Sequence, residues 1–415
     1  MTVHVVGAGV AGLAAALRLA EAGHAVLLHE ATAQAGGRCR ALPDGTDNGT
    51  HALLGANRSA LRFLKRIGAR EGWVEPEPGG LPVLDLATGG ASRVALSPFG
   101  WTDPARRPAG FDAGAVLALA RLALPARDRP VAAAMARHPE FLRGFVDPLV
   151  IAALNTPSLE ASSRRLGAVL RRLGTPGATR LFVARQGLGP DLVAPALVAL
   201  ARAGGQVRFG ARLRRLELHD GCLAALDFGE AAVRLGAGDA AVLATPPWES
   251  QRLLPLLPVP GAHAPIVNLH FAHATGGPVR FLGLLGALCQ WVLVRPVGVS
   301  VTVSAGDAAV REDLETLAPR AWAELRRAAL AFGLPGEWQA PPPPCRVVKE
   351  RRATPRHTPG AELRPPRLPA ANLALAGDWT DPVLPATIEA AIRSGEAAAR
   401  RLAATLQRPP GGPRR

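Results

Sequence analysis

A glycine-rich stretch near the beginning of the chain constrains the fold more than any other feature. Residues 3–38 read VHVVGAGVAGLAAALRLAEAGHAVLLHEATAQAGGR, in which a β-branched run precedes a GxGxxG motif at Gly7, Gly9 and Gly12. A helical segment and a second apolar run follow, and this strand–turn–helix–strand context is the one in which the motif binds a dinucleotide. Gly7 permits the tight turn, Gly9 lets the backbone approach a pyrophosphate, and Gly12 lets the helix pack on the strand. The stretch therefore predicts a parallel α/β sheet of the Rossmann kind.

The positions around this motif predict how each end of a dinucleotide is held. A helix that opens at Val10 and Ala11 turns unpaired N–H groups and the positive end of its dipole toward the phosphates. Glu30 stands at the end of the second apolar run. A carboxylate there accepts hydrogen bonds from both ribose hydroxyls of an adenosine and repels a 2′-phosphate.

A second glycine pair follows Glu30. Gly36 and Gly37 free the backbone to run beside a phosphate, and Arg38 supplies a forked cation for it. The alternative is a glycine turn followed by a solvated arginine. Together with GxGxxG and Glu30, the GGR segment indicates FAD rather than free NAD, and the combination resembles the start of flavin amine oxidases and phytoene desaturases.

Composition limits the partners. The chain has 415 residues, 48% of them hydrophobic, and a mean hydropathy of +0.14, which suffices for the core of two domains. The formal charge of +15 predicts attraction to an anionic membrane surface, with a merely solvated basic surface as the alternative. We expect no nucleic-acid partner, because recognition motifs are missing and only 4% of residues are aromatic.

The cysteines and apolar runs predict the compartment. Cys39, Cys222, Cys289 and Cys345 lie far apart without CxxC or metal spacing, which is typical of inert packing in a reducing compartment and predicts no metal site. No signal peptide is visible, and the apolar run of residues 281–294 is too short to span a bilayer. We expect a protein of the bacterial cytoplasm, peripherally associated with the inner face of the cytoplasmic membrane.

Proline and glycine clusters divide the chain between two domains. A β-meander followed by a buried parallel strand is expected after residue 203, and Leu213 there is a further expected cofactor contact. The predicted class is α/β: a Rossmann-like FAD-binding domain, with a parallel sheet and the meander, joined to an α+β substrate domain. We assign the FAD-binding domain to residues 1–82, 203–250 and 344–407, the substrate domain to 83–202 (helical part) and 251–343 (sheet part), and a disordered tail to 408–415.

A second cofactor signature is the segment LALAGDWTDPVLPATIEAAIRSG, which predicts a strand, a turn at Gly377 and Asp378, and a helix. In flavoproteins that it resembles, the matching Asp378 bonds a ribityl hydroxyl. The N–H groups from Ala386 through Thr387 to Ile388 then point at the N1/O2 edge of the flavin, where reduced flavin is negative. The alternative is a capping aspartate before an ordinary helix. Since the segment has no cysteine, we expect FAD to be held non-covalently.

Further segments are similar to the hydroxysqualene dehydroxylases of bacterial hopanoid and squalene synthesis. The similar segments are DNGTH at 47–51, AALNTP at 152–157, QW at 290–291, ERRAT at 350–354 and LPATIE at 384–389. Asn57 and Val146 stand where that family is expected to have Tyr and Trp, and residues 381–383 replace a Thr-Gly pair. These departures leave open a paralogue with another terpenoid substrate.

The resemblance implies reductive dehydroxylation of a C30 allylic alcohol. Loss of the hydroxyl as water leaves an allylic cation, which hydride from N5 of reduced FAD converts to squalene. The protein must supply a proton, for which His51 is the candidate, with Asp47 to orient it; a structural histidine is the alternative. Asn155, Gln290 and Trp291 are expected to line the substrate pocket, although Trp291 could equally belong to the core.

Several alternatives stay open at this point. Asp147 and Glu350 are other candidate acids or ion-pairing residues, and residues 111–124 form either an apolar surface patch or a core helix. The resemblance also implies an unidentified electron donor to FAD. A carotenoid-type desaturase that uses oxidised FAD is the rival enzyme, and a non-catalytic lipid escort of the same fold is the rival from another class. An amine oxidase fits poorly, since a chain without tyrosine lacks the usual aromatic cage.

Overall fold

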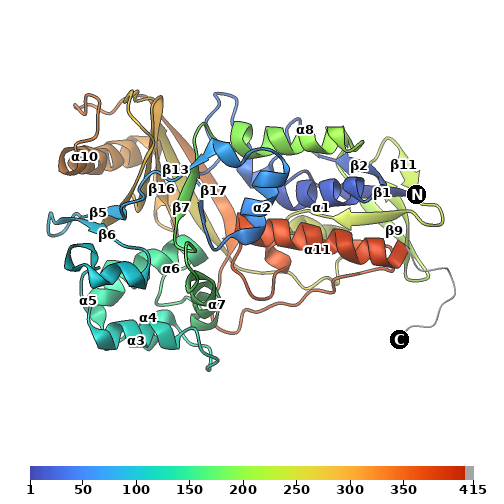
Figure 1. Ribbon diagram of the computed structural model, residues 1–415. Coiled ribbons are helices and arrows are strands. Elements are labelled where there is room, and N and C mark those ends of the chain that lie inside the picture. Colours follow the sequence, from blue (N-terminus) through green and yellow to red (C-terminus); the bar gives the residue numbers. More distant parts are fainter. Residues whose placement is uncertain (407–415) are drawn as a thin grey trace.

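The computed structural model describes residues 1–406, so the expected tail lies outside the described residues. Figure 1 shows two large sheets, with helices packed on one side of the molecule and a group of short helices below. The first sheet contains five parallel strands in the order β18-β12-β1-β2-β8. Their bounds are β1 (Thr2–Val6), β2 (Ala25–His29), β8 (Gln206–Arg208), β12 (Ala240–Leu243) and β18 (Leu373–Leu375).

Both faces of this parallel sheet are covered, which is why its strands are almost wholly apolar. On β1, Val3 and Val5 face a core shared with three helices, whereas Val6 faces the opposite side. The three helices lie side by side in Figure 1: α1 (Val10–Glu21), α8 (Ala194–Arg202) and α11 (Ile388–Leu406). The opposite side carries the meander β9 (Arg215–His219), β10 (Cys222–Asp227) and β11 (Ala232–Arg234), with α9 (Pro247–Leu253).

The second large sheet has seven strands in the order β17-β13-β16-β15-β14-β5-β6, antiparallel except for the β14–β5 pair. Their bounds are β5 (Leu81–Asp85), β6 (Ala91–Val94), β13 (His263–Phe271), β14 (Arg280–Leu285), β15 (Trp291–Arg295), β16 (Gly298–Val303) and β17 (Cys345–Pro355). Val267, Leu269 and Phe271 alternate along β13 and pack against α10 (Leu314–Phe332) on one face. The residues between them, such as Ile266 and Asn268, face the other way.

A small sheet and a helical part complete the fold. β7 (Leu181–Ala184) pairs with β3 (Ala52–Leu54) and β4 (Trp73–Val74), beside α2 (Arg58–Arg66). The helical part has its own apolar core around Trp101, Phe141 and Leu166. It consists of η3 (Pro98–Thr102), η4 (Pro104–Arg106), α3 (Ala113–Arg121), α4 (Val131–Ala134), α5 (Pro139–Phe141), η5 (Leu142–Val146), α6 (Asp147–Leu154) and α7 (Ser163–Leu173).

The α/β class is confirmed, and so is the parallel sheet with its meander. Two segments depart from the expected division. The segment assigned to the helical part begins in β5 and includes β6, both of which join the seven-stranded sheet. β17 also belongs to that sheet and pairs with β13 through Phe271–Cys345, so the chain returns to the parallel sheet only after residue 355. β5 and β17 lie next to proline clusters and show little alternation of polar and apolar residues, which hid them in the sequence.

Candidate functional site

A cavity of about 1300 Å³ connects the two large sheets. At one end it is lined by the glycine turn after β1, by Glu30 at the end of β2 and by Gly377 and Asp378 after β18. At the other end its walls come from the seven-stranded sheet and from the helical part. The carboxyl ends of parallel strands therefore open into a chamber built by the second sheet, where α/β folds commonly bind ligands.

The glycine turn leaves backbone room for a ligand. Gly7 has a φ of +102°, and a Cβ there would lie 2.6 Å from the carbonyl oxygen of Ala244. A Cβ on Gly12 would overlap the carbonyl oxygen of Gly7, so helix and turn could not pack. A Cβ on Gly9 would meet no atom within 4 Å, because this position borders the cavity. Gly9 thus offers the close backbone approach that the sequence motif predicts.

The two glycine segments of the sequence lie against each other. The N–H of Gly36 donates to the carbonyl of Ala8 at 2.8 Å, and Gly36 forms an isolated parallel bridge with Gly9. No side chain caps the N-terminus of α1, and among the described residues the N–H groups of Val10 and Ala11 have no acceptor. These donors line the cavity and suit a pyrophosphate.

Glu30 lines the same end of the cavity and is held by its own loop. Its Oε2 accepts the N–H of Ala8 at 2.9 Å, and its Oε1 accepts the N–H and hydroxyl of Thr32, each at 2.9 Å. A carboxylate has about four acceptor positions, so Oε2 retains one for a ribose hydroxyl. Leu213 is buried beside this end and lines the cavity as well.

Arg38 and Asp378, which come from opposite ends of the chain, form an ion pair with 2.6 Å between Nη2 and Oδ2. Arg38 also donates to the carbonyl of Ala353. Burial opposes the charged guanidinium, but the carboxylate of Asp378 outweighs burial and raises the pKa of Arg38. Because both residues line the cavity, a permanent cation and a carboxylate stand where the sequence predicts a phosphate and a ribityl hydroxyl.

The start of α11 also borders the cavity, and one of its expected donors is already used. The N–H of Ala386 donates to Nε2 of His357 at 3.1 Å, which corrects the expectation that it points at a flavin. Burial, with a smaller contribution from Arg165, lowers the pKa of His357 to about 3, so this imidazole is neutral and accepts. In the described chain the N–H groups of Thr387 and Ile388 have no acceptor and remain available.

One rung of the seven-stranded sheet forms a wall of the chamber. Asn268 pairs with Thr302, Thr302 with Trp291, Trp291 with Gly283, and Gly283 with Val83. All five line the cavity. A Cβ on Gly283 would lie 3.3 Å from the indole of Trp291, so the glycine gives this ring its space. The Trp291 ring stacks on Phe281 with centroids 5.7 Å apart.

The three expected pocket residues all line the cavity but differ in what their polar atoms do. Asn155 donates to the carbonyl of Ala264 at 3.2 Å and the hydroxyl of Thr354 at 3.0 Å, and accepts the N–H of Ala305 at 2.6 Å. It therefore fastens the helical part to the sheet.

Gln290 and Trp291 differ in their polar contacts. The side-chain oxygen of Gln290 accepts the N–H of Ser304 at 2.7 Å, and its side-chain nitrogen donates to the carbonyl of the same residue at 3.4 Å. The buried indole N–H of Trp291 has no hydrogen-bond partner. Trp291 is half-buried and stacked, so it is both a packing residue and a wall residue.

His51 lies in the cavity wall, but Asp47 does not orient it. Nδ1 of His51 is 3.0 Å from the carbonyl oxygen of Gly49, which fixes the proton on Nδ1, and burial lowers the pKa of the imidazole. The buried carboxylate of Asp47 accepts the N–H of Leu188 at 2.6 Å and pairs with Arg295 at 3.0 Å. No hydrogen bond joins Asp47 to His51 in the part of the chain that the structure describes, so a direct orienting contact is not formed.

Two acidic residues in the wall form no direct ion pair. Asp147 and Glu350 are half-buried and line the cavity, and within residues 1–406 neither side chain takes part in an ion pair or hydrogen bond, although the charge of Glu350 contributes to the raised pKa of Arg38. The expectation that they are ion-pairing residues is therefore corrected. Glu350 lies opposite Ile266 across the β13–β17 pair, on the strand whose Ala353 contacts Arg38.

Sequence reasoning missed several residues that shape the site. Glu389 at the start of α11 is buried, accepts the N–H of Ala60 at 2.8 Å and pairs with Arg172 at 3.3 Å, which joins α11 to α2 and α7. Asn268 and Thr302 were also missed. The alternation of β13, with Asn268 between apolar Val267 and Leu269, is a signal that would have found the first of them.

Other features place limits on the site. Among residues 1–406 no group of three or more His, Cys, Asp or Glu side chains is arranged to hold a metal ion. Cys39 lines the cavity, and burial raises the pKa of its thiol to about 12. No helix in this part of the chain is both long and apolar enough to cross a membrane.

The chain is similar along nearly its whole length to one family of flavoenzymes. The family described as flavin containing amine oxidoreductase matches residues 10–281 and 294–403. A hydroxysqualene dehydroxylase of Rhodopseudomonas palustris is 40% identical over 414 residues, covering 96% of this chain and 97% of that protein. One of Sinorhizobium fredii is 38% identical over 411 residues, covering 96% and 97%. These matches confirm the resemblance drawn from the motifs.

A solved structure supports the fold alone. An oxidoreductase of Methanosarcina mazei superposes with a TM-score of 0.72 at 15% identity, covering 96% of this chain and all of that one. At this identity the likeness extends to the two-sheet architecture and not to the substrate.

Proposed function

Because the chain belongs to the hydroxysqualene dehydroxylase family, within the flavin containing amine oxidoreductases, we propose that it converts hydroxysqualene to squalene. The protein is a flavin-dependent oxidoreductase. One observation carries the specific proposal. A cavity with a dinucleotide cradle at one end continues into a largely apolar chamber at the other.

The cofactor that we propose is FAD, held without a covalent bond. The uncapped start of α1 suits the pyrophosphate, Glu30 an adenosine ribose, and Asp378 a ribityl hydroxyl. Cys39 borders the cavity, but its high pKa keeps it a thiol, which is a poor nucleophile toward the cofactor.

The proposed reaction replaces the hydroxyl group of the substrate with a hydrogen atom. The substrate hydroxyl accepts a proton, the C–O bond breaks, and water leaves an allylic cation on the C30 chain. When bound and reduced, the flavin supplies the hydride that forms the new C–H bond. An electron donor of unknown identity must return two electrons to the site for each turnover.

The chain's own residues provide the other requirements. The apolar wall formed by side chains such as Val83, Ile266 and Phe281 excludes water that would trap the cation. The stacked rings of Phe281 and Trp291 present π-electron density, which is attractive to a cation. We propose that the imidazolium form of His51 donates the proton through Nε2 and returns to the neutral form, since the Nδ1 proton is held by the carbonyl of Gly49.

Glu350 is a second candidate for the proton donor. It lines the cavity, and its side chain forms no ion pair or hydrogen bond among the described residues, so its carboxyl group is free to contact the substrate hydroxyl. The low pKa of His51 also means that only a small fraction of this imidazole is protonated at neutral pH.

The test is an anaerobic assay with chemically reduced protein and detergent-dispersed hydroxysqualene. Squalene as the product is the expected result. Turnover of a carotenoid precursor by the oxidised protein, with no squalene from the reduced protein, would establish the desaturase instead. A purified protein that binds the C30 substrate but no flavin would establish the lipid escort.

A further inference from the structure

The outer face of α3 is apolar although it is exposed. Ala113, Leu117 and Ala120 of α3 are exposed and recur at the spacing of one helix face, and Leu124, in the turn that follows the helix, is exposed as well. Leu117 is 51% exposed and Leu124 is 63% exposed. The sequence left open whether residues 111–124 form a core helix or a surface patch, and the structure shows both. The inner side of the helix belongs to the helical core, and the outer side is a surface patch.

This patch borders the mouth of the chamber. Val116, Leu119, Ala120 and Ala123 of the same segment line the cavity, and Ala120 is both exposed and in the wall. Phe99 in η3, which also lines the cavity, is 74% exposed. An apolar surface thus continues from solvent into the chamber.

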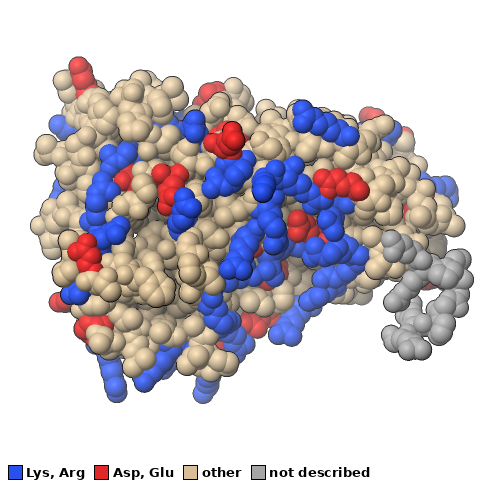
Figure 2. All heavy atoms as spheres, in the orientation of Figure 1, with Lys and Arg blue, Asp and Glu red and all other residues tan. Residues whose placement is uncertain are grey.

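Cations surround the patch. Arg121, Arg127 and Arg171 are exposed and form no ion pair within residues 1–406, and Arg171 donates to the carbonyl of Ala123 at 2.7 Å. Figure 2 shows Lys and Arg side chains projecting from the lower edge of the molecule, where Figure 1 places the helical part. Apolar side chains ringed by arginines match the chemistry of an anionic bilayer surface.

We propose that this α3 face, defined as Phe99, Leu117, Leu124, Arg121 and Arg127, docks on an anionic lipid bilayer and admits the substrate from it. The inference rests on the proposed function for its purpose, because a C30 alcohol resides in the bilayer. The assignment of the docking surface depends only on the exposure and charge of these residues. Leucine side chains enter the acyl boundary, and the arginines stay among lipid phosphates.

Vesicle co-sedimentation tests the apolar part of the face. The probes are vesicles of phosphatidylcholine alone and of phosphatidylcholine with phosphatidylglycerol. Wild type is expected to bind the anionic vesicles, and the double variant Leu117→Asp with Leu124→Asp to bind at least roughly tenfold more weakly. Neither residue lines the cavity.

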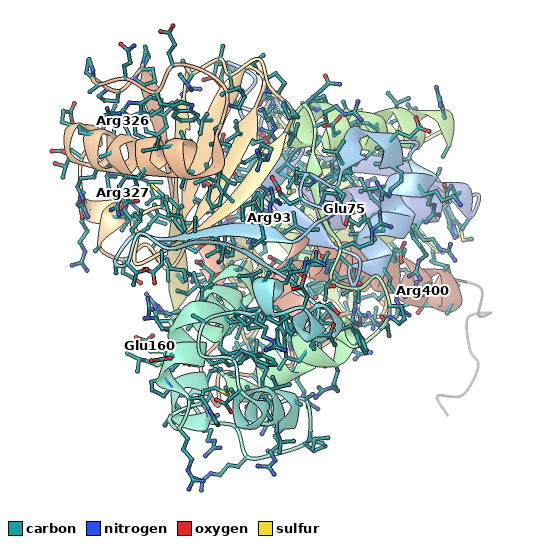
Figure 3. All side chains as sticks on the ribbon, turned by 60° about the vertical axis from the view of Figure 1, so that its left-hand side comes forward. Glu75, Arg93, Glu160, Arg326, Arg327 and Arg400 are labelled. Atoms are coloured by element: carbon teal, nitrogen blue, oxygen red, sulfur yellow. The ribbon has the colours of Figure 1, made fainter. Side chains whose placement is uncertain are left out.

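Matched controls come from leucines exposed elsewhere. Leu256 is 99% exposed and Leu330 is 88% exposed. Leu330 lies on α10, whose Arg326 and Arg327 lie above Glu160 of the helical part in Figure 3. The double variant Leu256→Asp with Leu330→Asp carries the same change in charge and is expected to bind as wild type does.

The charged part of the face has its own variants. Arg121→Ala with Arg127→Ala should weaken binding to anionic vesicles roughly 30-fold, at about 1 kcal/mol for each of the two cations near the surface. Arg202→Ala with Arg234→Ala, at exposed arginines without ion pairs elsewhere in the described chain, should have little effect.

The outcomes separate the surface from the reaction. Equal vesicle binding by wild type and the α3 leucine variant would overturn the proposal, and so would a dimer in light scattering that the same variant abolishes. Loss of vesicle binding with normal turnover of detergent-dispersed substrate supports it. Absence of squalene from wild type in detergent would contradict the reaction, and the vesicle measurement would still decide the surface.

Discussion

The two ends of the cavity are built in different ways. The dinucleotide end consists of backbone atoms presented by turns and of a few charged side chains beside them, and short sequence segments such as residues 7–12 and 36–38 each supply a part of it. The chamber end is one rung of a sheet, and its residues Val83, Gly283, Trp291, Thr302 and Asn268 come from five strands. The first end depends on backbone segments that lie in close contact, whereas the second depends on the shape of the wall that its side chains form.

Single substitutions at the two ends should therefore affect different properties of the protein. A change at the dinucleotide end meets backbone that cannot move, and its cost should be large. A change in the chamber alters one side chain of a wall, and its effect should appear mainly in substrate binding.

The glycine turn should show the largest effects, and two of its positions should separate folding from cofactor binding. Gly12→Ala places a Cβ on the Gly7 carbonyl and should lower the free energy of unfolding by about 3 kcal/mol or more. Gly9→Val points into open cavity and should leave the melting temperature of the flavin-free protein nearly unchanged while flavin content falls sharply. Thermal unfolding and flavin absorbance measure the two quantities. A stable, flavin-loaded Gly12→Ala would show that the close approach is not a constraint.

Loss of the proposed proton donor should have the next largest effect, and this effect should be on turnover. His51→Ala should keep bound flavin and lose turnover roughly 100-fold. An acid must be protonated, and burial places the pKa of His51 below its ordinary value of 6.5, so turnover should already fall as the pH rises through values below 6.5. The pH profile of kcat/KM measures this. If Glu350→Gln removes the activity and His51→Ala does not, the proton comes from Glu350.

Replacement of Asn155 should lower the stability of the protein more than its catalytic rate. Asn155→Ala leaves the N–H of Ala305 and the carbonyl of Ala264 unpaired in a buried place, which should destabilise the protein by about 2 kcal/mol. Chemical denaturation measures the change. An unaltered unfolding midpoint together with a large rise in KM would instead make Asn155 a substrate-binding residue.

Trp291 should show the smallest effect on folding. Its buried indole N–H has no partner, so Trp291→Phe loses no hydrogen bond and should change the free energy of unfolding by less than about 1 kcal/mol. Its ring lines the chamber, so KM for the C30 alcohol should shift several-fold. A large destabilisation with unchanged KM would place Trp291 in the core alone.

The contrast between the two ends also explains what the sequence predicts. Gly7, Gly9 and Gly12 are identifiable because local backbone geometry requires glycine there, and Glu30 and Arg38 because their charges follow these glycines within one contiguous segment. The fold class followed from the same segment and from the meander pattern. The pairing of Arg38 with Asp378 joins opposite ends of the chain, and only the family resemblance indicated that both belong to one site.

The remaining features depend on contacts between distant segments. Asp47 was expected beside His51 because they are close in sequence, but the fold directs its carboxylate to Arg295. The hydrogen bond from Ala386 to His357 and the ion pair of Glu389 with Arg172 likewise join separate elements. Strand register decides which side chains share a rung, and apolar strands with little alternation give few signs of it.

The central claim is that both ends of this chain together hold one flavin that faces an apolar chamber. Denaturing the purified protein and identifying the released cofactor by chromatography tests this most directly. The account predicts FAD, released by denaturation alone, in a one-to-one ratio with the chain. A colourless protein that takes up no FAD on incubation would contradict it.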